Sequence, residues 1–231
     1  LIMLNTIRKF IPKKVFRALQ PVYHYGLAVF GALLYRFPSR DIRVVAITGT
    51  KGKTSTAEMV NAILEEAGYK TALGGSLRFK IGKESTQNAY GMSMPGRSYL
   101  QKFIRKAVKE GCDWVVLEMT SEGAKQFRHS FIYLNAFIFT NLAPEHIESH
   151  GSFEQYLSDK KRIATLLSTS VKPRRVAIIN ADDPHAEDFV PSRATEVIRF
   201  KLEDAKLYRS GQDGTTFQFD GVTIHSPLKG E

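Results

Sequence analysis

The residues Thr48-Gly-Thr-Lys-Gly-Lys-Thr-Ser55 have the types and order needed to bind the phosphates of a nucleotide. A di- or triphosphate requires backbone N–H donors, a helix N-terminus and a mobile cation. Glycines at two positions let the backbone curl, the Lys53 amine can reach the β- and γ-phosphates, and the Thr54 hydroxyl can bind Mg²⁺. The predicted ATP-binding residues of this loop are Gly49, Thr50, Lys51, Gly52, Lys53, Thr54 and Ser55.

This loop differs from the common pattern G-x-x-x-x-G-K-[ST], because the position five before Gly52 is Ile47. Its neighbours nevertheless support the assignment. Residues 43–48 form a β-branched run typical of a buried strand, and residues 54–67 carry apolar side chains at helical spacing before Gly68 ends the pattern. A strand, a glycine loop and a helix in this order favour a phosphate site over a glycine turn with a chance Lys-Thr pair.

The same alternation of strands and helices continues along the chain. Strands are predicted over residues 70–74, 113–118, 135–140 and 175–180, and helices over 98–110 and 152–167, the latter with Ser152 as N-cap. We expect an α/β fold with a P-loop-type, mostly parallel sheet and helices on both faces. Polar residues such as Glu118 follow the strands, at the edge where open α/β sheets bind ligands.

From about Glu196 the pattern becomes strand–turn–strand, with turn signals at Asp213-Gly214 and Asp220-Gly221. We therefore expect a β-rich C-terminal extension. The chain has 231 residues and a single cysteine, Cys112, so it has no disulfide framework and suits a reducing, cytoplasmic setting.

The net charge of +10 is concentrated at one end of the chain. Residues 1–40 contain seven Lys or Arg and no acidic residue, so the remaining 191 residues carry only +3. A nearly balanced body does not fit a nucleic-acid-binding surface. We divide the chain into a basic, apolar, helical segment at 1–42 and an ATP-binding domain at 43–231. Residues 1–40 either pack on that domain or make peripheral contact with the inner membrane face.

Several blocks together resemble the Mur ligase family, namely its central ATP-binding domain. The phosphate loop has the short form found in that family. Further blocks follow in the family's order at Leu117–Ser121, Phe139–Leu142, Glu145-His146, His150-Gly151, Tyr156–Lys160 and Ile179–Asp183. One such block could arise by chance, but this many in register favours a true relationship.

Within the family, the chain most resembles the UDP-N-acetylmuramoyl-tripeptide synthetases. Those enzymes carry Thr-Thr-Pro before a helix and an arginine ten residues after the strand-end glutamate. Here Ser93-Met94-Pro95 precedes a helix, and Arg128 stands ten residues after Glu118. Ser93-Met94 replaces Thr-Thr, and Glu122 replaces a usual histidine. The resemblance implies a substrate-binding set of Ser93, Met94, Pro95, Thr120, Ser121 and Arg128.

The resemblance also implies the reaction and its cofactors. A carboxylate attacks the γ-phosphate of ATP, and an amino acid then displaces phosphate from the acyl phosphate to form an amide. Two Mg²⁺ ions are expected, the first bound by Thr54 and Glu118 and the second by His146 with Lys160 as a carbamate. Asn141 is expected to bind ATP. The implied catalytic residues are Lys53, His146 and Lys160.

Each of these residues also has a simpler explanation. Glu118 could be an exposed strand end, and Lys160 a solvated helix lysine. His146 and His150 are spaced for zinc on one helical face, although the glutamate between them is misplaced for a zinc protease. The pair Asp182-Asp183 could be only a turn and a helix cap before Pro184.

The family comparison leaves the function partly open. Only 42 residues precede the first strand, so we expect the uridine-binding domain to be replaced, and the C-terminal ligase domain to be absent from these residues and needed for activity. The main hypothesis is an amino-acid ligase of peptidoglycan synthesis that uses UDP-muramoyl-peptide and amino-acid substrates. The alternatives are a polyglutamate-synthase-like ligase at the membrane and a non-catalytic nucleotide-binding module.

Overall fold

The computed structural model describes residues 13–96, 98–145 and 147–227, and their core is an eight-stranded sheet. The strand order is β4-β3-β2-β5-β1-β6-β7-β8. The pairings among β2, β5, β1, β6, β7 and β8 are parallel, and β3 and β4 form an antiparallel edge. The strands are β1 (Arg43–Thr48), β2 (Thr71–Gly74), β3 (Arg78–Ile81), β4 (Glu84–Gln87), β5 (Trp114–Glu118), β6 (Ala136–Phe139), β7 (Val176–Asn180) and β8 (Glu196–Phe200).

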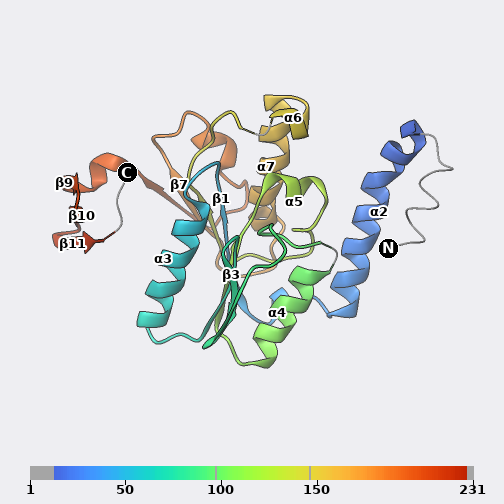
Figure 1. Ribbon diagram of the computed structural model, residues 1–231, viewed down its shortest axis with the longest axis horizontal. Coiled ribbons are helices and arrows are strands. Elements are labelled where there is room, and N and C mark those ends of the chain that lie inside the picture. The colour runs from blue at the N-terminus through green and yellow to red at the C-terminus, as the bar shows by residue number, and fades with distance from the viewer. Residues whose placement is uncertain (1–12, 97, 146, 228–231) are drawn as a thin grey trace.

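Helices cover both faces of this sheet (Figure 1). Side chains alternate along β1, so Val45 and Ile47 pack toward α3, whereas Val44 and Ala46 join the larger core beneath α4 and α7. The helices are α2 (Lys13–Leu34), α3 (Lys53–Glu66), α4 (Tyr99–Lys109), α5 (Ser121–Lys125), α6 (Ile147–His150) and α7 (Phe153–Ser168), with short 3₁₀ turns η1 (Pro38–Arg40), η2 (Ala186–Phe189) and η3 (Leu202–Asp204). The predicted α/β architecture is confirmed.

Most predicted elements are confirmed within one or two residues, including the Ser152 N-cap, whose hydroxyl accepts a hydrogen bond from the Gln155 N–H. One prediction needs correction, and one hairpin was not predicted. The strand beginning at Glu196 is β8, which pairs parallel with β7 in the main sheet and is not part of a separate β-rich unit. The β3–β4 hairpin was not predicted, because β4 is a short, fully exposed edge strand without an apolar face.

A second, smaller sheet forms the C-terminal extension. The strands β9 (Lys206–Gly211), β10 (Gly214–Phe219) and β11 (Val222–Ser226) pair antiparallel. The residues Asp213-Gly214 and Asp220-Gly221 lie at the two turns, as predicted. This sheet lies on the opposite side of the molecule from α2 (Figure 1).

In the described part of the N-terminal segment, Lys13–Leu34 form one helix, α2, which packs beside α4 and is followed by η1. Its C-terminal end is held by Arg105 of α4, whose guanidinium donates to the carbonyls of Tyr35 and Arg36 (both 3.0 Å) and pairs with Asp41. A cation at this end of a helix interacts favourably with its dipole. Close contact occurs at Gly31, where an added Cβ would overlap the Ser98 side chain. Among the described helices, none is long and apolar enough to cross a membrane.

Two glycines of α2 provide a matched test of this packing. Alanine favours a helix by about 1 kcal/mol over glycine, so Gly26→Ala, which meets nothing within 4 Å, should leave stability unchanged or raise it. Gly31→Ala should lower stability by about 1 to 3 kcal/mol, because its Cβ would lie 2.7 Å from the Ser98 Cβ. Urea unfolding of the two variants measures the difference, and equal stability would show that α2 does not pack against Ser98.

Candidate active site

The carboxyl ends of the central strands bring the predicted site residues to one edge of the sheet. β1 lies between β5 and β6, with Ile47 opposite Glu118 and Thr48 opposite Phe139. The buried Thr48 hydroxyl donates to the Met119 carbonyl at 3.0 Å and ties two of these ends together. The segments that follow β1, β5 and β6 therefore meet.

Neighbouring segments help to shape the phosphate loop. A Cβ at Gly49 would overlap the Thr140 hydroxyl, and Gly52 has a left-handed φ of 79°. The Asn141 Oδ1 accepts from the backbone N–H groups of Thr50 (3.1 Å) and Lys51 (2.8 Å). Asn141, predicted to bind ATP, thus shapes the loop. Because α3 begins directly after Gly52, its first N–H groups face the loop as an anion site requires.

Glu118 and Thr54 lie together, as the prediction of a shared Mg²⁺ requires. The Thr54 hydroxyl donates to Glu118 Oε2 at 3.0 Å. The same carboxylate accepts from the Ser76 N–H (2.9 Å), the Ser76 hydroxyl (2.8 Å) and the Ser93 hydroxyl (2.9 Å). Glu118 is only 3% exposed, so it is not a solvated strand end. A carboxylate and a hydroxyl at a helix N-terminus are the oxygen donors that Mg²⁺ prefers, so these residues fit the ion.

Lys53 occupies a desolvated position beside these groups. Its Nζ donates to the Thr50 carbonyl at 2.8 Å. Burial lowers the pKa of the Lys53 amine, and the charges of Glu118 and Glu145 act in the opposite direction. An amine in this setting gains more from a bound polyphosphate than an exposed lysine would, because less water must be displaced.

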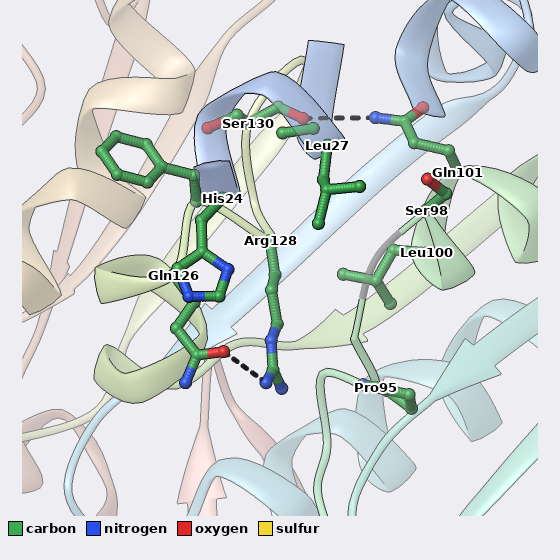
Figure 2. Close-up of a pocket in the computed structure, with 11 residues that line it drawn as sticks. His24, Leu27, Pro95, Ser98, Leu100, Gln101, Gln126, Arg128 and Ser130 are labelled. Atoms are coloured by element: carbon green, nitrogen blue, oxygen red, sulfur yellow. Dashed lines mark hydrogen bonds between the residues drawn. The ribbon is translucent and has the colours of Figure 1, made fainter. Parts of the chain in front are cut away.

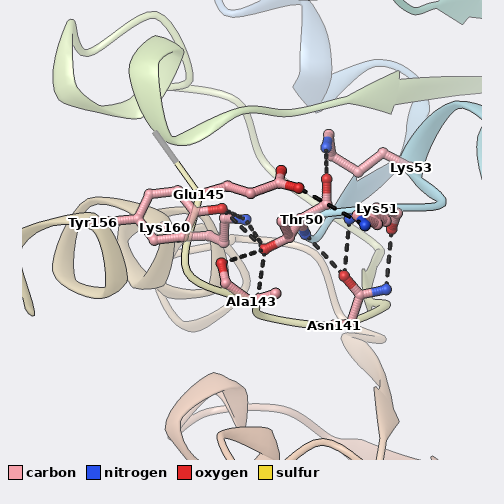
Figure 3. A network of polar contacts seen from close by, with 8 residues as sticks. All are labelled: Thr50, Lys51, Lys53, Asn141, Ala143, Glu145, Tyr156 and Lys160. Carbon is pink, nitrogen blue, oxygen red and sulfur yellow. Dashed lines mark hydrogen bonds and ion pairs between the residues drawn. The ribbon is translucent and has the colours of Figure 1, made fainter. Parts of the chain in front are cut away.

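Lys160 is buried, with only 2% of its surface exposed. Its Nζ donates to the Tyr156 hydroxyl (2.5 Å) and the Thr50 hydroxyl (3.3 Å), both neutral acceptors (Figure 3). Burial, followed by repulsion from Lys53, lowers the pKa of Lys160 to about 7. The alternative of a solvated lysine is therefore wrong, and a substantial fraction of this amine is neutral near pH 7.

Lys53 and Lys160 line one cleft of about 350 Å³. Of the residues predicted from the sequence, its lining includes Gly49, Thr50, Lys53, Ser93, Thr120, Ser121 and Lys160. His146, predicted as a catalytic residue and metal ligand, lies outside the described residues. The hydroxyl of Thr120 accepts from the Gly123 N–H as the N-cap of α5.

The remaining predicted substrate residues, Met94, Pro95 and Arg128, do not line the cleft. Met94 is buried, and its sulfur accepts from the Thr120 N–H. Arg128 donates to the Met94 carbonyl and to Gln126 Oε1 (2.6 Å). Pro95 and Arg128 line a different cavity of about 80 Å³, which α2 closes with His24 and Leu27 (Figure 2). The structure thus brings Ser93 and Ser121 to the cleft but not Pro95 and Arg128.

Some site residues were not identified from the sequence. Ser76 follows a predicted strand without a distinguishing motif, and only the fold brings it to Glu118. Tyr156 stands four residues before Lys160, a helical spacing that could have revealed the pair. Asp159 contacts His150 at 3.0 Å across a loop, which no sequence spacing indicates.

Asp183 accepts from the backbone N–H groups of Leu142 (2.6 Å) and His185 (2.8 Å), so it stabilises a turn, and Asp182 accepts from the Leu202 N–H. Within the described ranges, no three His, Cys, Asp or Glu side chains lie together as a metal site, and His150 contacts Ser121 and Asp159. The described residues therefore do not support a zinc site.

Comparison with known proteins agrees with this arrangement. A family model described as the Mur ligase middle domain matches residues 47–231. A UDP-N-acetylmuramyl-tripeptide synthetase of Roseiflexus sp. (strain RS-1) is 34% identical over 214 residues, which cover 86% of this chain and 42% of that protein. The chain thus spans about two fifths of the length of the curated relatives it matches.

Solved structures share the fold. A UDP-N-acetylmuramoyl-L-alanyl-D-glutamate–2,6-diaminopimelate ligase superposes with a TM-score of 0.69 at 24% identity, over 81% of this chain and 39% of that one. A Mycobacterium tuberculosis folylpolyglutamate synthase complexed with ADP gives 0.64 at 17% identity, over 84% and 50%. From the matched domain and the sequence identity, this chain belongs to the Mur ligase family.

Proposed function

We propose that the protein is an ATP-dependent ligase that joins an amino acid to a carboxylate of a UDP-N-acetylmuramoyl-peptide in peptidoglycan synthesis. The carrying observation is that Lys53 and the buried Lys160 line a single cleft, and that Glu118, which pairs with Thr54, is hydrogen-bonded to Ser76 and Ser93 of the cleft lining. The names of the curated relatives support the substrate class. A module that only binds nucleotide would not need a second buried lysine in the same cleft.

The proposed reaction has two steps. A carboxylate oxygen of the acceptor attacks the γ-phosphorus of ATP and breaks its bond to the β–γ bridging oxygen, which leaves with ADP. The amine of the amino acid then attacks the acyl carbon, loses a proton and expels inorganic phosphate. Lys53 would hold the β- and γ-phosphates, and the loop N–H groups would bind their oxygens.

Mg²⁺, when bound, would neutralise phosphate charge and draw the two anionic reactants together. Thr54 and Glu118 would hold the first ion, and His146 with a Lys160 carbamate would hold a second. The carbamate forms when the neutral Lys160 amine attacks CO₂ and loses a proton. The fully buried position and the lowered pKa of Lys160 support this modification.

The ligase assignment predicts that Lys53→Met and Glu118→Gln abolish acceptor-dependent ADP release. Each change removes a charge that acts on the phosphates or their metal, so we expect losses of about a hundredfold or more. The assay uses the full-length protein with ATP, Mg²⁺, UDP-N-acetylmuramoyl-dipeptide and a panel of amino acids. The exposed Lys106→Met is the control. ATP binding without acceptor-dependent turnover would favour a regulatory module, and turnover with folates and glutamate would favour the polyglutamate-type ligase.

The carbamate predicts a ¹³C NMR signal when the protein is supplied with ¹³C-bicarbonate. The signal should weaken as pH falls below about 7, because protonation removes the neutral amine that binds CO₂. Lys160→Met should lack the signal and lose turnover by about a hundredfold, with partial recovery in acetate. The neighbouring Lys161, which pairs with Asp188 at 2.8 Å, provides the control Lys161→Met. A signal that persists in Lys160→Met would contradict the proposal.

We also propose that α2 contacts an anionic membrane surface. Six apolar side chains follow a helical spacing on its outward face and are 39–69% exposed: Leu19, Val22, Tyr23, Phe30, Leu33 and Leu34. We call them the α2 stripe. In the sequence, residues 1–40 include seven basic and no acidic residues, which favours anionic lipid as the partner. An apolar stripe with flanking basic residues is typical of a helix that lies in the membrane interface.

The membrane contact predicts cosedimentation with phosphatidylglycerol vesicles, stronger than with phosphatidylcholine alone and weakened by salt. The double substitution Phe30→Ser and Leu33→Ser should weaken binding by about tenfold or more, since each removes apolar surface from the contact. Val171→Ser, at an exposed apolar residue outside α2, is the control. Dimerisation that the double substitution abolishes, without vesicle binding, would instead identify the stripe as a protein interface.

A further inference from the structure

Ser121, His150 and Asp159 form a hydrogen-bonded chain that runs from the interior to the cleft. Asp159 Oδ2 lies 3.0 Å from His150 Nδ1, and His150 Nε2 lies 3.1 Å from Ser121 Oγ. The side chains of His150 and Asp159 are each 1% exposed. Ser121 and His150 line the same cleft as Lys53 and Lys160, so the chain ends beside the proposed reaction centre.

The chemistry of the three groups sets the direction of the hydrogen bonds. Asp159, which also forms an ion pair with Arg162 (3.6 Å), can only accept as a carboxylate, so it holds the imidazole proton on Nδ1. With the ring in this tautomer and uncharged, Nε2 is an acceptor, and Ser121 donates its single proton to it. The Ser121 oxygen is left with only lone pairs to offer the cleft.

The neighbouring hydroxyls are committed to other partners. The Thr120 oxygen accepts from the Gly123 N–H, and Ser93 donates to Glu118. Tyr156 and Thr50 accept from Lys160. Ser121 differs from these hydroxyls, because a buried carboxylate orients it through the intervening His150 ring.

We propose that His150 and Asp159 are positioning residues that hold Ser121 as a hydrogen-bond acceptor for an N–H group of a substrate. This inference rests on the proposed ligase function and adds a specificity element to its site. Two N–H donors fit the chemistry, namely a peptide N–H of the muramoyl-peptide acceptor and the amine of the incoming amino acid. The substrate whose Michaelis constant rises identifies which of the two N–H donors Ser121 binds.

The test is a double-substitution cycle in the full-length protein. Ser121→Ala removes the acceptor, and Asp159→Asn allows the amide to donate to Nδ1, which moves the imidazole proton to Nε2 and reverses the polarity of Ser121. Each substitution should raise the KM of one substrate by about tenfold, which corresponds to the loss of roughly one hydrogen bond. The KM of ATP should stay within about twofold of its original value. A rise for the acceptor identifies the peptide N–H, and a rise for the amino acid identifies the amine.

If Asp159 acts through Ser121, the double variant should raise the substrate KM no further than Ser121→Ala alone does. If the fold-increases in KM of the two single variants multiply in the double variant, or if the KM of ATP rises equally, the role is merely structural and the inference is overturned. Ser121→Thr, which keeps the hydroxyl, should retain most of the affinity. Should Asp159→Asn fail to fold, His150→Gln takes its place in the cycle.

A surface pair provides the matched control. His185 and Asp188 make a similar contact at 3.2 Å outside the cleft lining, so Asp188→Asn should change none of the three KM values. If the unmodified protein shows no acceptor-dependent ADP release, the ligase function fails and this inference falls with it. If the unmodified protein turns over normally but the effects of the two substitutions on KM are additive in free energy, only the inference fails.

Discussion

The parallel pairing of β1 between β5 and β6 is the constraint on which the site depends. Parallel register brings the carboxyl ends of all three strands to one edge, so Thr48, Glu118 and Thr140 lie close although about ninety residues separate the outer two. The loop after β1 can then be braced by Asn141 from the end of β6. Gly49 tolerates no side chain because Thr140 occupies the adjacent space. A change in this register would remove the loop geometry and the Thr54–Glu118 contact together.

The distribution of charge in the cleft follows from burial. Lys53 and Lys160 both lie away from water, and burial disfavours the charged form of each amine. Repulsion from Lys53 disfavours the charged form of Lys160 further. The hydrogen bonds of Lys160 go to two hydroxyl oxygens, which stabilise an ammonium less than a carboxylate would. The cleft therefore favours a bound polyanion.

The two sides of helix α2 have different surroundings. Its inward side packs through Gly31 against Ser98 and through Tyr25 against Phe127, at a ring separation of 5.6 Å. Its outward side carries the α2 stripe. A helix that is apolar on both sides is normally buried in a larger assembly or at a membrane. Through His24 and Leu27, α2 also closes the cavity that Arg128 lines.

The sequence by itself determined the phosphate loop, the strand-end glutamate, the order of strands and helices, and the Ser152 cap, because each depends on neighbouring residues or a short period. It left β3–β4 unrecognised, since an exposed edge hairpin has no apolar periodicity, and it could not place β8 in the main sheet. Only the tertiary structure decided that Lys160 is buried, that Asn141 braces the loop, that Pro95 and Arg128 face another cavity, and that Ser121, His150 and Asp159 connect. These properties depend on contacts between residues distant in the chain, and on the exclusion of water when they pack, which no local pattern encodes.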